Sequence, residues 1–163
     1  MQIRVLTTGG TIDKIYYDRK DTFTVGEPQI GDLLREANLA VDWVVEPLFR
    51  KDSLELSEED RLLIRRAAEQ APEKKILITH GTDTMVQTAM TLQGIPEKTL
   101  VLVGSMQPAR FRQSDAVFNI GAAVMALQLL PVGAYIAMHG RIFDPARTRK
   151  NLDLHRFEDI PPA

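Results

Sequence analysis

Short apolar runs alternate along this chain with longer segments in which apolar residues recur every three or four positions. Each run ends at glycine, proline or clustered polar residues, which is typical of buried β-strands. The expected strands are Ile3–Leu6, Val41–Phe49, Lys75–Thr79, Thr99–Val103 and Val132–Met138. A short sixth strand is expected at Arg141–Phe143, followed by a charged C-terminal loop.

The longer periodic segments predict helices with one apolar face. The expected helices are Gln29–Ala37, the segment from Ser57 to Pro72, Asp83–Gln93 and the segment from Ser114 to Leu130. Ser57 and Asp60 form a capping-box-like pair, and Ser114 is a good N-cap. Aromatic residues, threonines and charged residues between residues 13 and 26 predict a loop or a loose hairpin of Tyr16-Tyr17 and Phe23-Val25.

Strands that alternate with helices at this spacing predict an α/β fold. We expect one domain over residues 1–163, with a mostly parallel sheet and helices on both faces, flavodoxin- or Rossmann-like. Ligands of such sheets bind outside the carboxyl ends of the strands. The polar turns Thr8–Thr11, His80–Thr84 and Gly104–Gln107 all follow predicted strands, so we expect them to converge at one edge of the sheet.

Composition narrows the classes of protein. The chain has no cysteine, which excludes a disulfide framework, a cysteine nucleophile and thiolate-bound zinc. We expect a cytoplasmic protein, because no signal peptide pattern opens the chain and no apolar run could cross a bilayer. The net charge of −2 gives no overall attraction to nucleic acid or membrane. The basic run Arg141–Lys150 is read as a solvated loop in preference to a polyanion site.

Two threonine-rich turns carry the candidate chemistry. The glycine pair before Thr11 allows a tight turn, but the spacing of phosphate-binding loops is missing. Thr82 and Asp83 stand where a strand ends and a helix begins, and Lys150 follows the last expected strand. A threonine hydroxyl needs a neighbouring base or charged partner to react, and a lysine–aspartate pair can serve. Each residue alone also fits a structural role: a local hydrogen bond for Thr11, a helix cap for Asp83, a solvated side chain for Lys150.

Taken together, the motifs resemble those of the bacterial-type L-asparaginases. Residues 8–12 (Thr-Gly-Gly-Thr-Ile) are similar to the first signature of that family, and residues 79–85 (Thr-His-Gly-Thr-Asp-Thr-Met) to the second. Residues 102–106 resemble a third recurring strand and turn. The resemblance covers essentially the whole chain and corresponds to the N-terminal domain of the family.

The resemblance implies hydrolysis of L-asparagine to L-aspartate and ammonia. Thr11 would attack the side-chain amide and form an acyl-enzyme ester, which water then cleaves. Thr82, supported by Lys150 and Asp83, would lie across the amide from Thr11. Whether Lys150 acts as a base or as electrostatic support stays open. No metal or organic cofactor is implied.

The resemblance also implies contacts with the substrate. Asp83 would hold the α-ammonium group, and Ser53 resembles the serine that binds the α-carboxylate. Backbone N–H groups near Thr11 and Thr82 are candidate oxyanion donors. The remaining candidates for substrate contacts are Asp52, Gly10, Gly81 and Ser105.

This sequence departs from the family in three places. We expect the usual C-terminal domain to be absent, since the chain looks most like short, single-domain asparaginases. Phe23 stands where the family has a tyrosine that supports the nucleophile, so Tyr16, with Tyr17 behind it, is the candidate replacement. The Ser105-Met106-Gln107 turn leaves the preference between asparagine and glutamine open.

Three other functions remain as alternatives. They are a glutaminase component of a tRNA amidotransferase, a module that binds asparagine or aspartate without turnover, and a structural subunit of a hetero-oligomer. We also expect a homodimer or higher homo-oligomer, since the open edge of the sheet needs another wall to exclude water.

Overall fold

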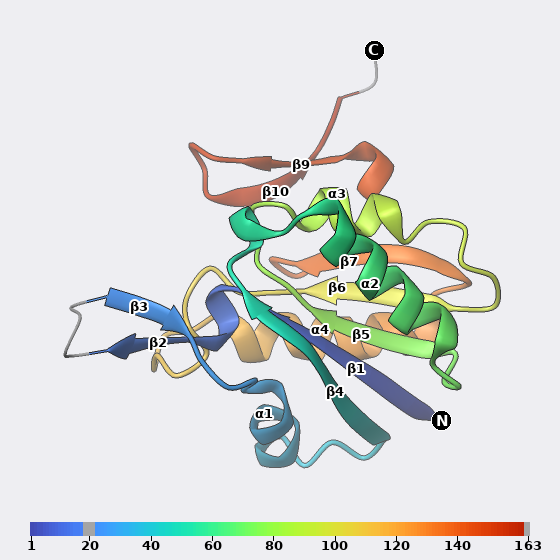
Figure 1. The fold of residues 1–163 in the computed structure, drawn as a ribbon, viewed down its shortest axis with the longest axis horizontal. Helices are drawn as coiled ribbons and strands as arrows, with labels where there is room; N and C mark the ends of the chain where they lie inside the picture. Colours follow the sequence, from blue (N-terminus) through green and yellow to red (C-terminus); the bar gives the residue numbers. More distant parts are fainter. Residues whose placement is uncertain (18–21, 162–163) are drawn as a thin grey trace.

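The centre of the molecule is a mostly parallel sheet, as a computed structural model that describes residues 1–17 and 22–161 shows (Figure 1). Its strands are β1 (Gln2–Gly9), β4 (Asp42–Lys51), β5 (Lys75–Thr79), β6 (Thr99–Val103), β7 (Gly133–Met138) and β8 (Arg141–Phe143). Their order is β4-β1-β5-β6-β7-β8, and only the edge strand β8 runs antiparallel among these six. Numbered along the chain, the five parallel strands have the flavodoxin-like order 2-1-3-4-5. The α/β prediction is confirmed.

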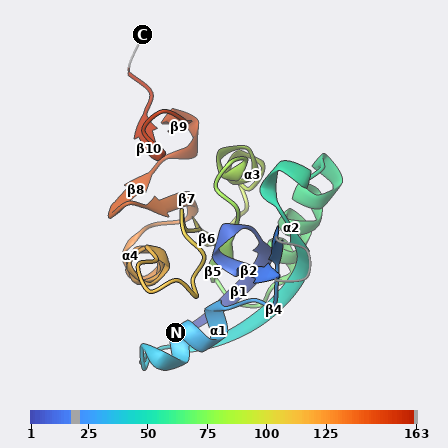
Figure 2. The ribbon, with the colours of Figure 1, turned by 90° about the vertical axis from the view of Figure 1, so that its left-hand side faces the viewer.

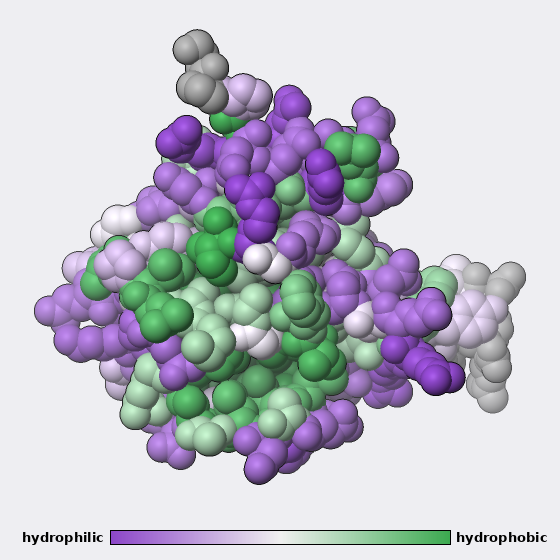
Figure 3. All heavy atoms as spheres, turned by 180° about the vertical axis from the view of Figure 1, so that it is seen from behind, coloured by the Kyte–Doolittle hydropathy of each residue, from purple (hydrophilic) through white to green (hydrophobic). Residues whose placement is uncertain are grey.

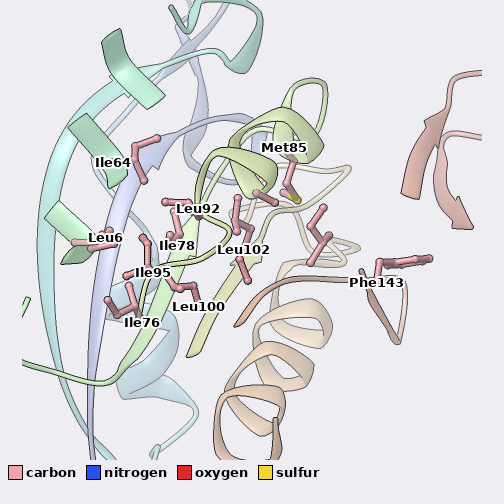
Figure 4. Packing of buried hydrophobic residues seen from close by; sticks show 14 of the residues in the cluster. Leu6, Ile64, Ile76, Ile78, Met85, Leu92, Ile95, Leu100, Leu102 and Phe143 are labelled. Carbon is pink, nitrogen blue, oxygen red and sulfur yellow. The ribbon is translucent and has the colours of Figure 1, made fainter. Parts of the chain in front are cut away.

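Helices cover both faces of this sheet, which Figure 2 shows as three layers. One face carries α1 (Ile30–Glu36) and α4 (Ala116–Leu129), and the other carries α2 (Glu58–Gln70) and α3 (Met85–Thr91). Within β5, Ile76 and Ile78 pack toward α2 and α3 while Leu77 packs toward α4, as the two-residue period of a strand requires. Figure 4 shows the cluster on the α2–α3 side, where β5 and β6 pack against Ile64, Met85 and Leu92.

Two predicted helix starts are wrong by one or two residues. The N-cap of α4 is Asp115, one residue after the predicted Ser114, although the Ser114 hydroxyl oxygen accepts the N–H of Ala116 at 3.1 Å. The α3 helix begins at Met85 and not at Asp83. Asp83 donates its N–H to Ser53 Oγ, 3.2 Å away, which keeps it in the turn. The capping box of Ser57 and Asp60 at the start of α2 is confirmed.

Two hairpins project from the sheet. The predicted one consists of β2 (Lys14–Tyr17) and β3 (Thr22–Val25), and residues 18–21 between them lie outside the described residues. The second corrects our prediction of a charged loop. After a short 3-10 helix, η4 (Pro145–Arg147), the strands β9 (Thr148–Asn151) and β10 (Arg156–Asp159) pair antiparallel.

This second hairpin was not predicted because its outer face is charged and only its inner face is buried. Thr148 and Phe157 point inward and are buried, and Phe157 packs on Phe143 and His139. On the outer face Arg149 pairs with Glu158 at 2.8 Å. A single buried aromatic residue is too weak a signal of alternation. Across residues 1–17 and 22–161, no helix is long and apolar enough to span a membrane.

Candidate active site

The turns after β1 and β5 meet at the point where the strand order reverses. These strands are neighbours, and Thr7 pairs with Thr79 near their carboxyl ends. Thr8 donates its hydroxyl hydrogen to the Thr79 carbonyl at 2.8 Å, which ties the two strand ends together. In open α/β sheets a ligand binds in the crevice at this switch point.

Glycines bring the backbones of these turns into contact. Gly10 has φ 91°, and a Cβ atom on it would lie 2.5 Å from the Cα of Gly81. A Cβ atom on Gly81 would lie 2.6 Å from Cβ and Oγ of Ser53, which follows β4. A Cβ atom on Gly104 would collide with the carbonyl oxygen of His80 and lie 3.4 Å from Thr82 Cγ2. The expected convergence of the polar turns is therefore confirmed.

Lys150 joins this site from the hairpin β9–β10, which lies beside α3 (Figure 1). Its Nζ donates to Thr82 Oγ1 at 2.8 Å and to Asp83 Oδ1 at 2.6 Å. The Lys150 side chain is 12% exposed and that of Asp83 37%, so the pair lies at the wall of an open site. The structure thus brings Thr82, Asp83 and Lys150 into contact, the three residues that the sequence analysis grouped as one cluster.

Thr11 begins a short 3-10 helix, η1 (Thr11–Asp13), directly after Gly10. This helix is held at both ends. Asp13 donates its N–H to the Gly10 carbonyl at 3.2 Å, and the Ile12 carbonyl accepts the N–H of Ala109 at 3.0 Å. The half-buried Thr11 is thereby set beside the contact of Gly10 with Gly81, the residue before Thr82.

Ser53 is buried in the 3-10 helix η3 (Ser53–Glu55) and faces the second turn. Its hydroxyl oxygen accepts the N–H of Asp83, and its carbonyl accepts the hydroxyl of Thr84 at 2.7 Å. Asp52 caps η3 and pairs with Lys14 at 2.7 Å. Partial burial alone would raise the pKa of Asp52. The Lys14 ammonium, the Leu54 N–H and the charge of Lys150 outweigh this effect, so the pKa of Asp52 lies below its usual range.

His80 fixes the turn that carries Thr82. Its ring is fully buried, and burial lowers the pKa of His80 to about 4, so the ring is neutral at pH 7. Nδ1 lies 2.7 Å from the Gly81 carbonyl and Nε2 lies 2.8 Å from Thr88 Oγ1. Because a carbonyl only accepts, Nδ1 carries the proton and Nε2 accepts from Thr88. The role of His80 is to orient the Gly81 carbonyl.

The third turn is held by two residues that sequence reasoning missed. The Asp115 carboxylate accepts the N–H groups of Met106, at 3.0 Å, and Gln107, at 3.1 Å. Asn119 donates to Asp115 at 2.8 Å and to the Gly104 carbonyl at 3.1 Å, and it accepts the His139 N–H at 3.1 Å. An asparagine in the middle of a largely apolar helix was the available signal.

Within this turn, Ser105 is buried and donates its hydroxyl hydrogen to the Gln107 carbonyl at 2.5 Å. A contact between Ser105 and substrate would therefore involve its backbone, unless this internal hydrogen bond breaks.

Tyr16 lies on β2, in the hairpin β2–β3 that projects from the sheet (Figure 1). Its half-exposed ring packs edge-on against Phe23 with centroids 5.5 Å apart, and Phe23 packs against Phe111 at 6.0 Å. The side chain of Tyr17 lies outside the described part of the structure.

Comparisons with known proteins agree on one family. A family profile described as "Asparaginase, N-terminal" matches residues 2–157. The glutaminase-asparaginase of Acinetobacter glutaminasificans is 28% identical over 169 residues, which cover 93% of this chain and 50% of that protein. A glutamyl-tRNA(Gln) amidotransferase component of Methanococcus vannielii is 32% identical over 154 residues, 87% of this chain and 35% of that protein.

Among solved structures, the thermostable L-asparaginase from Thermococcus kodakarensis matches with a TM-score of 0.85 and 29% identity. The match covers 98% of this chain and 51% of that one. The chain thus spans about half or less of the length of the relatives named here.

Proposed function

This chain belongs to the asparaginase family, and from that premise we propose that it hydrolyses L-asparagine to L-aspartate and ammonia. The observation that carries the proposal is the double hydrogen bond of Lys150 to Thr82 and Asp83, formed where Gly10 touches Gly81. Thr82 is held by the Lys150–Asp83 pair, and Thr11 directly follows Gly10. In the proposal Thr11 is the nucleophile and Thr82 relays its proton.

In the proposed reaction Thr11 Oγ1 attacks the amide carbon while its proton leaves toward the relay. The amide C–N bond then breaks, the leaving nitrogen takes a proton and departs as ammonia, and an ester remains on Thr11. Water attacks this ester, gives up a proton, and releases L-aspartate with the Thr11 hydroxyl restored. Since Thr82 Oγ1 accepts from Lys150, its own hydrogen is available to the leaving nitrogen while its oxygen takes the proton of Thr11. In this relay the Lys150 ammonium stabilises the Thr82 oxygen and accepts no proton.

The substrate's two charges have partners in this proposal. The Asp83 carboxylate faces the α-ammonium group, and the Ser53 hydroxyl with nearby N–H groups faces the α-carboxylate. Gly10 and Gly81 leave the backbone exposed for donors to a developing oxyanion. The residues assigned to substrate contacts are Ser53, Asp52, Gly81, Gly10 and Ser105, and Tyr16 is assigned to support Thr11.

The test is ammonia release from L-asparagine and L-glutamine by wild type, Thr11→Ala and Thr82→Ala. Thr91→Ala, which removes a hydroxyl from the outer surface of α3, is the matched control. We expect turnover of asparagine by wild type and the control and its loss in both other variants. Full activity of Thr11→Ala would refute the mechanism. If aspartate raises the melting temperature of wild type but wild type releases no ammonia from either substrate, the chain is a binding module.

A second candidate is an amidase component of a larger assembly. It is favoured by the 32% identity to the glutamyl-tRNA(Gln) amidotransferase component of Methanococcus vannielii. Glutamine turnover that begins only when a partner protein is added would support this candidate over the first.

The proposal includes a homo-oligomer in the cytoplasm. Asp83 is 37% exposed, so water reaches the site unless a second copy covers it. A cysteine-free chain suits a reducing compartment. Light scattering of the purified protein and fractionation of cells test these two statements separately.

A further inference from the structure

His139 lies in the turn between β7 and β8, at the edge of the sheet that carries the candidate active site. Its φ of 55° falls in the left-handed region, where few residues other than glycine, asparagine, aspartate and histidine are found. Its backbone N–H donates to Asn119 Oδ1 at 3.1 Å, and this bond holds the turn in place. Asn119 also donates to the Gly104 carbonyl, so His139 and the third turn share one anchor.

The ring of His139 contacts the hairpin β9–β10. It packs against Phe157 of β10, with ring centroids 6.0 Å apart and an angle of 37° between the two planes. Phe143 contacts the same Phe157 ring at 6.2 Å. Phe157 is 3% exposed and is the single buried residue of β10. The inner face of β10 is therefore attached to the sheet through the aromatic rings of His139, Phe143 and Phe157.

The two ends of this hairpin differ in how they are held. Figure 3, where the hairpin forms the upper part of the molecule, shows its outer surface as mainly hydrophilic. At the base, Arg141 forms an ion pair with Asp159 at 2.6 Å. At the tip, Leu152 and Leu154 are 68 and 55% exposed, and none of residues 151–156 is buried. The contacts of Phe157 therefore fix the position of the middle of the hairpin.

Lys150 occupies that middle position as the direct partner of Phe157. Directly paired residues of antiparallel strands point to the same face, with Cβ atoms about 4.5–5.5 Å apart. The stem of Lys150 therefore lies beside the Phe157 ring. Its ammonium is 2.8 Å from Thr82 Oγ1 and 2.6 Å from Asp83 Oδ1. A shift of the strand by roughly 1 Å is enough to break both contacts, because a separation of about 3.6 Å is no longer a hydrogen bond.

The His139 ring is uncharged at pH 7. Its Nε2 is buried and has no hydrogen-bond partner in the part of the chain that the structure describes. A doubly protonated ring must place an N–H at this atom, with no acceptor for it. The charged groups that act on the ring are Asp115 at the start of α4, Arg156 of β10 and Lys150 of β9. Burial, aided by Arg156 and Lys150, lowers the pKa of His139 below its usual value, although Asp115 opposes the shift.

We propose that His139 is a positioning residue for Lys150. Its neutral ring holds Phe157 in place, and Phe157 in turn holds the ammonium of Lys150 against Thr82. His139 touches no substrate in this proposal, and its relevance to catalysis rests on the proposed function. In acid, a proton on the ring adds a second cation beside Lys150 and an N–H without an acceptor next to Phe157. The hairpin is then released, and the rate falls as the pH drops below about 6.5.

The first test measures how well Lys150 is protected from acylation by acetic anhydride in the whole chain, with mass spectrometry as the readout. Lys74, whose side chain is 70% exposed, is the fast reference, and the buried Lys98 reports whether the fold stays intact. The variant His139→Asn keeps the left-handed backbone but loses the ring. In it, acylation of Lys150 relative to Lys74 is expected to rise by about tenfold or more, because the hairpin opens locally.

His155→Asn is the matched control, because His155 has φ 47° and lies exposed in the turn of the same hairpin. It should leave Lys150 as protected as in wild type, and Lys98 should stay protected in both variants. If Lys150 stays protected in His139→Asn, or becomes equally reactive in the two variants, the proposal falls. Acylation needs no turnover, so an inactive wild type would refute the proposed function and still leave this test decisive.

The second test is the pH profile of asparagine turnover, with His139→Phe as the variant that keeps an aromatic ring and cannot be charged. We expect His139→Asn to lower kcat by about tenfold or more with KM unchanged, since a misplacement of about 1 Å costs up to about 10²-fold. His139→Phe should recover most of this rate and should lack the decline below about pH 6.5 that wild type shows. A purely structural ring would change the melting temperature but not this profile. The same pH profile in wild type and His139→Phe, or equal kcat in the two variants, would overturn the proposal.

Discussion

Gly10 and Gly81 touch through their backbones, with no side chain between them. A methyl group on Gly10 would come within 2.5 Å of the Gly81 Cα, and the positive φ of 91° at Gly10 disfavours any other residue. Through this contact the turn after β1 lies against the turn after β5, and the candidate nucleophile lies beside its relay. The site is therefore sensitive to a single methyl group added at Gly10 or Gly81.

Gly10→Ala is expected to lose asparagine turnover and to lower the free energy of unfolding by about 1–3 kcal/mol, since the two turns must separate. Turnover assays and urea unfolding measure both effects. Gly31→Ala is the control, because its nearest neighbours would be ordinary contacts at 3.8 Å. An active Gly10→Ala protein would mean that the two turns need not touch in the working enzyme.

Lys150→Met keeps the length of the side chain and removes the ammonium that contacts Thr82 and Asp83. We expect kcat to fall by about 10²–10⁴, the usual contribution of acid–base groups, with stability changed by less than about 1 kcal/mol. Arg149→Met, on the outer face of the same strand, should leave the rate unchanged. A rate loss shared by both variants would point to damage of the hairpin.

Asp115→Ala should free the turn that carries Ser105, because three hydrogen bonds to its carboxylate disappear. We expect a higher KM for asparagine, an altered ratio of asparagine to glutamine rates, and a loss of about 1–3 kcal/mol in stability. Asp115→Asn retains one acceptor oxygen and should lie between the two. If Asp115→Ala lost stability with no change in KM or substrate preference, the third turn would not contact substrate.

Tyr16→Phe tests the assignment of a supporting hydroxyl to the first hairpin. We expect kcat to fall by roughly tenfold or more with no change in melting temperature, because the ring stays half-exposed against Phe23. Phe23→Tyr in that background should restore part of the rate, since it places a hydroxyl where the family has its tyrosine. Unchanged kinetics in Tyr16→Phe would remove Tyr16 from the site.

Asp13 makes stability depend on pH. Burial raises the pKa of Asp13 to about 6, although the Gln29 N–H, 2.9 Å from its carboxylate, and the charge of Arg50 oppose the rise. A folded pKa above the unfolded value means that the folded state binds the proton more tightly. Stability from this group is therefore complete below about pH 4 and is lost as pH rises through 6.

The matching variant is Asp13→Asn, which keeps an acceptor for Gln29. Relative to wild type, its free energy of unfolding should increase by about 2–3 kcal/mol between pH 4 and pH 7.5. Urea titrations at the two pH values measure this difference directly. Parallel pH curves for the two proteins would show that Asp13 is not held in its protonated form by the fold.

Three strands of the central sheet could be predicted from the sequence to the residue, whereas the ends of β1, β4 and β7 differ from the prediction by one to three residues. The bounds of β5, β6 and β8 agree with the prediction, because each is a short apolar or β-rich run ended by turn-forming residues. The hairpin β9–β10 could not, because ion pairs such as Arg149 with Glu158 make its outer face look like a solvated loop. The alternation of apolar and polar residues predicts a buried strand only where one face of that strand is consistently apolar.

For the candidate site, the sequence predicted the candidate reactive residues but not the residues that hold them in place. Thr82, Asp83 and Gly81 are adjacent, so one turn contains them, and the expected convergence of the polar turns at one edge of the sheet implied that Gly10 would lie near. Asp115 and Asn119 act through hydrogen bonds to the backbone of another segment, and the His80 ring is held by the hydroxyl of Thr88 on α3. Such partners depend on tertiary structure, which a single sequence does not reveal.

The hairpin β9–β10 also sets when the site can exist during synthesis. Lys150 meets Thr82 and Asp83 across 68 and 67 residues of chain, and it is translated after every strand of the central sheet. A nascent chain can therefore build the sheet on the ribosome while its threonines still lack their ammonium partner. Contacts of such long range form slowly, so catalysis should begin only after the polypeptide has passed residue 150 and closed on itself.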